Sequence, residues 1–193
     1  MIVGLYITML PLILSGIVNM LFVKTPIYKK YNIPIDCNKN WIDGKRIFGD
    51  NKTFIGFISM IVFCIIFQIL WGYVGELCQL NSQNDWYLVY SNLIGYNVVS
   101  GFLVGLFYML FELPNSFIKR RINIIPGKTD KGIKGVVFFV IDQIDSLIGV
   151  FLVLKLLSGI AWSKYFLYLL VGGLTHITIN LMLWLCGIRR NLL

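Results

Sequence analysis

The chain has 193 residues, of which 58% are apolar and only 13% are charged, and its mean hydropathy is +0.78. This composition is far too apolar for a water-soluble domain and indicates an integral membrane protein. The net charge of +8 should meet anionic lipid head groups and nucleotides at the membrane surface, and we expect no nucleic-acid partner.

Four uncharged stretches of 23 to 26 residues are each long enough to cross the ~30 Å hydrocarbon core of a bilayer as a helix. A fifth stretch, at about 136–157, is as apolar except for Asp142, Gln143, Asp145 and Lys155. The sequence therefore predicts a single all-α transmembrane domain over 1–193, a bundle of five transmembrane helices joined by two cytoplasmic loops. The expected spans are about 1–23, 53–75, 86–111, 136–157 and 165–188, and the expected cytoplasmic loops are 24–52 and 112–135.

The distribution of basic residues predicts the orientation. Fifteen of the 17 Lys and Arg residues lie in the two long loops and the C-terminal tail, and Lys155 and Lys164 are the other two. By the positive-inside rule the N-terminus is expected outside and the C-terminus in the cytoplasm, in a multi-pass protein of the cell membrane. The first span lacks a basic n-region and is followed by Lys24 rather than a cleavage site, so we interpret it as a retained helix.

The first long loop leads into the second span through Arg46-Ile-Phe-Gly49-Asp50-Asn-Lys52-Thr53. Gly44 and Gly49 permit tight turns, and free amides with Lys and Thr at a helix start can form an anion cradle. The simpler alternative is a solvated basic loop that only obeys the positive-inside rule.

The second long loop begins with Glu112-Leu-Pro-Asn115-Ser116-Phe-Ile-Lys119-Arg120-Arg121. Apolar residues follow the basic cluster, so it could lie in the interface or dip into the bundle. A cluster that only sets topology is the alternative.

The acids of the fourth span make a chemical site the stronger interpretation. Asp142 and Asp145 share a helix face, and an ionised carboxylate inside the membrane costs about 2.5 to 3.5 kcal/mol unless it is paired. Paired acids with nearby Lys and Arg suit phosphoryl or nucleotidyl transfer, in which Mg²⁺ bridges carboxylates and phosphates. A structural ion pair with Lys119 or Arg120, and proton or cation conduction, are the alternatives.

In the last span, His176 and Asn180 lie one turn apart. They could line a polar cavity or be buried and hydrogen-bonded, and Asn19 at the end of the first span poses the same question. The Gly172-Gly173 pair permits close helix packing, within one chain or between chains. The four cysteines have no metal-binding or CxxC spacing, and neither a disulfide nor a zinc site is expected.

Taken in order, these segments resemble the CDP-archaeol synthase family, small five-helix relatives of the phosphatidate cytidylyltransferases. The resemblance covers nearly the whole chain. It rests on Asn19, Pro34-Ile35-Asp36, the stretch from Asp43 to Gly56, Ser116-x-x-Lys119-Arg120-Arg121, Pro126-Gly127, Asp142-Gln143-x-Asp145, and His176 with Asn180. It implies that the phosphate of a phosphatidic-acid-type lipid attacks the α-phosphate of CTP, giving a CDP-lipid and pyrophosphate.

The resemblance also implies roles for individual residues. Asp142 and Asp145 would hold Mg²⁺, and Lys119 with Arg120 would hold triphosphate oxygens; these four are the expected catalytic residues. The expected substrate-binding residues are Asn19, Arg46, Asp50, Lys52, Thr53, Asn115, Ser116, Arg121, His176 and Asn180.

The chain departs from the family pattern at two places. Phe111-Glu112 stands where such families usually carry Gly-Asp, and Pro114 precedes the Ser; Glu112 can still bind Mg²⁺ through a longer side chain. The segment 128–134 replaces a more apolar one that contains Pro, which bears on lipid specificity.

Three alternatives remain from the sequence. The same reaction could act on diacyl phosphatidate rather than on an archaeal ether lipid, and no residue separates the two. A small ion-coupled transporter or channel could use Asp142 and Asp145 as a cation site. A non-catalytic assembly protein would explain the basic loops but not acids within a span.

Overall fold

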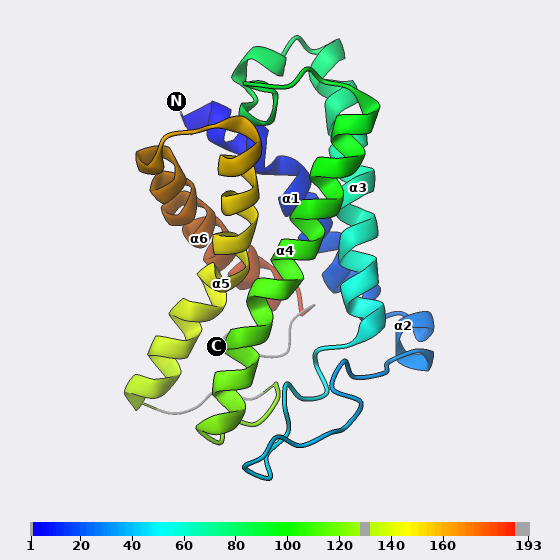
Figure 1. The fold of residues 1–193 in the computed structure, drawn as a ribbon, viewed down its shortest axis with the longest axis vertical. Coiled ribbons are helices and arrows are strands. Elements are labelled where there is room, and N and C mark those ends of the chain that lie inside the picture. The colour runs from blue at the N-terminus through cyan, green and yellow to red at the C-terminus, as the bar shows by residue number, and fades with distance from the viewer. Residues whose placement is uncertain (1, 128–131, 188–193) are drawn as a thin grey trace.

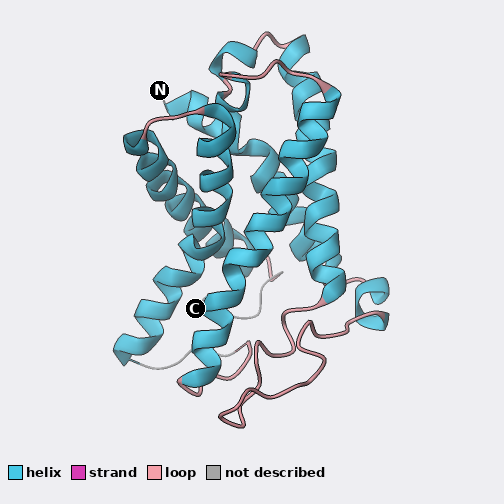
Figure 2. Ribbon diagram, viewed as in Figure 1, coloured by secondary structure: helices cyan, strands magenta, loops and turns pink. Residues whose placement is uncertain are grey.

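The computed structural model describes residues 2–127 and 132–187, and within them it contains helices and loops without strands (Figure 2). Five helices are long and apolar enough to cross a membrane. They are α1 (Ile2–Phe22), α3 (Phe54–Leu77), α4 (Ile94–Arg121), α5 (Gly132–Ser158) and α6 (Trp162–Leu185). The predicted all-α, multi-pass membrane architecture with five spans is confirmed.

Short elements close the two ends of the bundle (Figure 1). One end carries α2 (Pro26–Lys30) and the long loops 31–53 and 122–127, and is called the loop end below. The other carries the 3-10 turns η1 (Asn81–Gln83) and η2 (Asp85–Tyr87) and the tight turn from α5 to α6, and is called the capped end. Thr25 caps the short helix α2, whose Pro26 lies in the first turn, where a missing amide hydrogen costs nothing.

The observed helix bounds correct one of the predicted elements. A span was expected at 86–111 and a loop from 112, but α4 starts at Ile94 and continues as helix to Arg121. A helix ends where its last carbonyl groups find partners rather than where hydropathy falls, and the basic residues of its last turn favour the negative end of the helix dipole. Pro114 is accommodated inside this helix. Of the basic residues predicted to face the cytoplasm, Lys128, Lys131, Arg189 and Arg190 lie outside the described residues.

Small residues let α4 pack closely on both neighbours. A Cβ at Gly105 would lie 2.5 Å from the Ile61 Cα on α3, and one at Gly101 would lie 2.7 Å from the Ile65 Cα. On the other side, a Cβ at Gly149 of α5 would lie 2.7 Å from the Phe107 carbonyl oxygen. These approaches fix α3, α4 and α5 side by side.

The remaining helices pack on the outside of this layer. α1 lies against α3 and α6 lies against α5, so the packing order is α1, α3, α4, α5, α6. In the described residues α1 and α6 form no extensive interface with each other, and the ring of helices is therefore loosely closed between them. A hydrogen bond of 3.1 Å between the hydroxyls of Tyr6 and Thr175 connects the two.

The capped end is tied together by the buried carboxylate of Asp85. It accepts hydrogen bonds from the Lys164 ammonium (2.8 Å) and the Tyr168 hydroxyl (2.6 Å), both on α6. Its own backbone amide donates to the Thr8 hydroxyl on α1 at 2.9 Å. This paired, fully satisfied carboxylate connects η2 to both outer helices.

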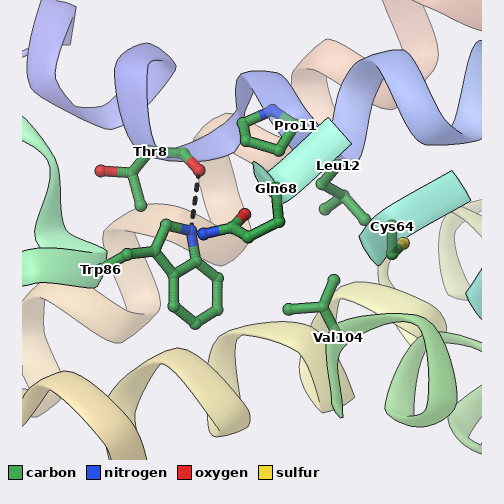
Figure 3. Close-up of a pocket in the computed structure, with 7 residues that line it drawn as sticks. All are labelled: Thr8, Pro11, Leu12, Cys64, Gln68, Trp86 and Val104. Carbon is green, nitrogen blue, oxygen red and sulfur yellow. Dashed lines mark hydrogen bonds between the residues drawn. The ribbon is translucent and has the colours of Figure 1, made fainter. Parts of the chain in front are cut away.

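Pro11 opens a small gap in the hydrogen bonds of α1. Since Pro11 has no amide hydrogen, the Ile7 carbonyl accepts instead from the Trp71 indole at 2.7 Å, and the Trp86 indole donates to the Thr8 carbonyl at 3.1 Å. Figure 3 shows Trp86, Thr8 and Gln68 around a cavity of about 10 Å³ beside this proline. Indole groups thus replace the missing helical partner inside the bundle.

Candidate functional site

The two acids of α5 meet on one side chain of α4. The Asn115 side-chain nitrogen donates to Asp142 Oδ1 and to Asp145 Oδ2, both at 2.6 Å. Asp145 is almost buried, and its Oδ1 also accepts from the Ser146 amide at 2.7 Å. One amide therefore holds two carboxylates together, and the predicted pairing of Asp142 with Asp145 on a single helix face is seen in the structure.

Lys119, the first residue of the basic run at the end of α4, reaches Asp142. Lys119 Nζ lies 2.5 Å from both carboxylate oxygens of Asp142, as the structural alternative from the sequence had anticipated. The Arg120 Nε and Nη1 atoms are buried and have no hydrogen-bond partner among the described residues. Two buried guanidinium nitrogens without acceptors are costly, and they mark a position suited to an anion.

Gly49 brings the first loop against Arg120. Its φ of +100° favours glycine, and a Cβ there would lie 2.7 Å from Pro126 Cγ and 3.8 Å from Arg120 Cδ. The loop of residues 31–53 and the Pro126-Gly127 turn therefore meet at the arginine. The amides of Phe48 and Gly49 donate to Asp36, and an anion cradle in this loop stays a prediction.

Glu112 forms an ion pair with Lys52 from the loop that enters α3. Burial would lower the pKa of Lys52, but Glu112, Asp145 and Asp142 together outweigh it and raise the pKa above its ordinary value. Lys52 is therefore a charged ammonium that is paired with Glu112.

A second buried carboxylate, Asp36, organises the loop of residues 31–53. Arg46 donates to both of its oxygens at 2.8 and 3.2 Å, and the amides of Asn38, Phe48 and Gly49 donate to it at 2.9 to 3.1 Å. Burial would raise the pKa of Asp36, but these hydrogen bonds prevail and lower the pKa to about 2. The sequence had marked Asp36 only as part of a motif, and this role was missed.

The loop is also fixed to the end of α4. Arg121 pairs with Asp43 at 3.1 Å and donates to the carbonyls of Lys45 and Arg46, while Lys45 Nζ donates to the Arg121 carbonyl at 2.6 Å. Trp41 packs edge-on against Phe117 with ring centroids 5.5 Å apart. Arg121 thus positions the loop rather than facing the acids, and its predicted contact with substrate stays a prediction.

The polar residues of α6 gather around Gln143. The Asn180 side-chain nitrogen donates to Gln143 Oε1 at 2.7 Å, and His176 Nδ1 donates to the Gln143 carbonyl at 3.1 Å. Gln143 is buried and lies between the two aspartates in the sequence. Sequence reasoning gave it no role, although a glutamine inside a span was a visible signal.

A cavity of about 170 Å³ opens beside the acids. Its polar wall comes from α4, α5 and α6, and its apolar wall comes mainly from α1. The polar lining is Tyr108, Glu112, Asp142, Gln143, His176 and Asn180; the apolar lining is Leu12, Ile13, Gly16, Ile17, Met20 and Ile179. The cavity therefore offers charged groups and hydrocarbon surface to one ligand.

The remaining predicted site residues lie at varying distances from this cavity. The Asn19 side chain accepts from the Ser59 hydroxyl at 2.6 Å, Thr53 caps α3 and bonds to the Tyr28 hydroxyl at 2.8 Å, and Asp50 pairs with Arg46 at 2.9 Å. Ser116 lies one turn before Lys119 on α4. Contacts of these four with a substrate stay predictions.

The donor set fits a hard divalent cation. Asp142 and Asp145 converge on a single point, now met by the Asn115 amide, and Glu112 lines the same cavity as Asp142. Carboxylate oxygens are what Mg²⁺ prefers. Within residues 2–127 and 132–187, no three acidic, histidine or cysteine side chains already stand close enough to enclose an ion. Such a cation would have to replace some of the contacts that Lys119 makes with Asp142 and that Lys52 makes with Glu112.

Comparison with known proteins gives a consistent result. A family model described as CarS-like CDP-archaeol synthase matches residues 3–192. The CDP-archaeol synthases of Saccharolobus islandicus and Saccharolobus solfataricus are 30% identical to the chain over 161 residues, which is 83% of the chain and 81% of each relative. The CDP-archaeol synthase of Methanospirillum hungatei is 28% identical over 165 residues, which is 82% of the chain and 88% of the relative.

A solved structure has the same fold. It is described as an intramembrane enzyme for archaeal membrane lipid biosynthesis, and it superposes with a TM-score of 0.57 at 23% identity. The match covers 91% of this chain and 92% of the solved chain. The arrangement of five helices is therefore shared over nearly the whole length of both.

Proposed function

The chain belongs to the CDP-archaeol synthase family, and from this premise we propose that Asp142, Asp145, Lys119 and Arg120 form its active site. The protein is a membrane-embedded transferase that uses CTP to activate a lipid phosphate to a CDP-lipid. The sequence had left two other classes of protein open, an ion-coupled transporter and a non-catalytic assembly protein. The transferase activity of the family replaces both.

One observation carries the assignment of the site. Two carboxylates converge on Asn115, and a few residues further along α4 the buried Arg120 has guanidinium atoms without hydrogen-bond partners among the described residues. The acids suit a cation, and Arg120, which lies beside Gly49 of the first loop, suits an anion. A metal-bound triphosphate requires both.

The reaction can be written with these residues. A phosphate oxygen of the lipid attacks the α-phosphorus of CTP, a new phosphorus–oxygen bond forms, and the bond from the α-phosphorus to the bridging oxygen breaks as pyrophosphate leaves. We assign to Lys119, Arg120 and Lys52 the neutralisation of the charge that grows on the leaving group. Asn115 and Ser116 would shape the pocket around it.

The family of CTP-dependent cytidylyltransferases indicates a divalent metal. We assign its ligands to Asp142 and Asp145, with Glu112 as a third, on the convergence of the two aspartates and the cavity they share with Glu112. When bound, Mg²⁺ would link carboxylates to phosphate oxygens and withdraw charge from them.

We also propose how the substrates approach. The basic loops lie at the loop end, and the positive-inside rule supports our proposal that this end faces the cytoplasm and that the N-terminus lies outside. CTP would reach Arg120 and the loop of residues 31–53 from water. The lipid would be the archaeal ether phosphatidate named by the relatives' activity rather than the diacyl form.

The test is a transfer assay with purified protein, Mg²⁺ and CTP labelled in its α-phosphate. Ether phosphatidate with geranylgeranyl chains and diacyl phosphatidate are supplied separately, and the lipid fraction is extracted and counted. Label in the ether lipid is expected, with loss of label in Asp142→Asn and in Asp145→Asn. Full labelling by both variants would move the active site elsewhere.

A further inference from the structure

The short helix α2 lies at the loop end, outside the ring of spans and beside the start of α3 (Figure 1). It begins three residues after the end of α1, and its Tyr28 contacts Thr53, the residue that caps α3. Two spans therefore begin or end at its level. This is the level at which the hydrocarbon of a bilayer gives way to lipid head groups.

Only one side of α2 is anchored to the protein. Tyr28 is buried, its ring packs edge-on against Phe22 with centroids 6.0 Å apart, and its hydroxyl lies 2.8 Å from the Thr53 hydroxyl. The other four residues of the helix are exposed. Because a helix of five residues is marginal on its own, contacts on its other sides would stabilise it.

The exposed apolar surface of α2 continues the lipid-facing surface of the spans. Ile27 and Tyr31 lie one helical turn apart and are 59% and 53% exposed. Leu21 at the end of α1 and Phe54 and Ile58 at the start of α3 are exposed as well. An isoleucine and a tyrosine side by side suit the boundary between hydrocarbon and head groups, where tyrosine is enriched in membrane proteins.

Basic side chains accompany this apolar surface. Lys24, Lys29 and Lys30 are exposed, and none of them forms an ion pair with another described residue. Segment 21–33 contains no acidic residue. The Lys30 ammonium lies over the Tyr31 ring, 5.3 Å from its centroid, as a lysine does when its stem follows an apolar surface and its charge reaches the head groups. The three charges complement the phosphates of anionic lipids.

The backbone that follows α2 is bonded to the start of α3. The Ile33 carbonyl accepts from the Phe54 amide at 3.0 Å, and the Ile35 amide donates to the Lys52 carbonyl at 2.8 Å. Whatever holds α2 in place therefore also fixes the depth at which the loop of residues 31–53 begins and ends.

We propose that α2 is an interfacial anchor that binds the head groups of anionic lipids in the leaflet at the loop end. Ile27 and Tyr31 enter the boundary between head groups and chains, and Lys24, Lys29 and Lys30 contact the lipid phosphates. The anchor holds the loop of residues 31–53 at a fixed depth. The inference concerns a surface outside the proposed active site and does not rest on the proposed reaction.

Hydrogen exchange in nanodiscs tests the anchor without substrate. The protein is placed in discs of phosphatidylcholine that contain increasing mole fractions of phosphatidylglycerol, and exchange of the amides of residues 27–33 is followed. Exchange should slow severalfold as the anionic lipid is added. In a double variant with Lys29→Gln and Lys30→Gln, the mole fraction that gives half of this protection should rise about fivefold or more, because each lysine near an anionic surface contributes about a fivefold preference.

The matched control removes the same charge from other exposed positions at the loop end. A double variant with Lys39→Gln and Lys134→Gln changes the loop of residues 31–53 and the start of α5. Its half-protecting mole fraction should stay within about twofold of the wild-type value. An equal rise in both double variants would mean that the net charge of the loop end attracts the lipid, and it would overturn the assignment to α2.

Two further outcomes would overturn the proposal. Equal protection in discs of phosphatidylcholine alone would mean that α2 has no preference for anionic head groups. Protection by soluble glycerol phosphate in those same discs would mean that the lysines bind a free anion rather than a lipid. Since CTP is absent from the experiment, failure of the protein to form a CDP-lipid would bear on the proposed function and not on this anchor.

Discussion

Lys52 and Glu112 are 60 residues apart in the sequence and form an ion pair that joins the start of α3 to the middle of the site. Each side chain is about one-fifth exposed. Removal of either partner leaves a charge that is only partly solvated, so Lys52→Met and Glu112→Gln should each destabilise the protein by about 2 kcal/mol.

A double-mutant cycle separates the pair from its surroundings. The double variant should lose less stability than the sum of the two single variants, as measured by thermal unfolding in detergent. Additive losses would mean that the two residues act independently. Because Lys52 also interacts electrostatically with Asp142 and Asp145, Lys52→Met should in addition weaken CTP use.

Asp145→Asn should abolish CDP-lipid formation, with a fall in rate of at least about 100-fold, while the protein still folds. An amide keeps the shape of the side chain but cannot offer two anionic oxygens to a metal. Rates are measured by transfer of α-labelled CTP to lipid. Glu76→Gln is the matched control, since this exposed residue lies at the capped end of α3, and its rate should equal that of the wild type.

Arg120→Met should weaken CTP binding without lowering the stability of the protein. Its buried Nε and Nη1 atoms have no acceptor among the described residues, so the substitution should leave the melting temperature unchanged or raise it. The Kd for CTP should rise about 10- to 100-fold with the loss of a charge-assisted contact to phosphate. Lys29→Met on the exposed face of α2 should change neither quantity, and an unaltered Kd in Arg120→Met would move the triphosphate away from this arginine.

Asp36 makes the loop of residues 31–53 sensitive to acid. Its pKa in the folded protein is about 2, below the ordinary value of 3.8, so the folded state favours the ionised form. The resulting stabilisation, about 2 kcal/mol, is fully present above pH 4 and is lost as the pH falls through the range from 4 to 2. Asp36→Asn should lack this acid-dependent loss, and it should be less stable than the wild type at neutral pH.

Limited proteolysis of this loop, read between pH 2 and pH 7 with an acid-tolerant protease, follows the opening directly. An identical pH profile in the wild type and in Asp36→Asn would mean that another group controls the loop.

At the capped end, Asp85→Asn should lower thermal stability and leave the KM for CTP unchanged. The substitution removes the charge that pairs with Lys164 and accepts from Tyr168, at the end of the bundle opposite the loops. A selective rise in the KM for CTP would show that the two ends are coupled.

The sequence was a good guide to those parts of the molecule that hydropathy and charge determine. Five spans follow from the length of the apolar runs, and Asp142 meets Asp145 because a helix brings residues three apart to one face. The extension of α4 through Pro114 to Arg121 could not be predicted in the same way. It depends on where backbone carbonyls find partners, and hydropathy carries no information on that.

Contacts between distant segments were the other limit. That Asp36 would bind Arg46 and three loop amides, or that Gln143 would join His176 and Asn180, depends on the folding of loops and on helix rotation. Arg121 shows the same limit, since its neighbour Lys119 contacts the acids while it turns to the loop. A motif of three basic residues does not reveal which of them faces inward.

A membrane that stores an ion gradient cannot tolerate a continuous path of water across it. An enzyme that admits a triphosphate from one side also admits water into part of the membrane's thickness. On α5 and α6, Leu147, Phe151, Leu154 and Tyr168 are fully buried, and they fill the bundle between the site and Asp85. Asp85 and Lys164 neutralise each other beyond this plug. The capped half of the bundle therefore presents a packed apolar layer and a neutralised ion pair, which oppose the passage of water and ions.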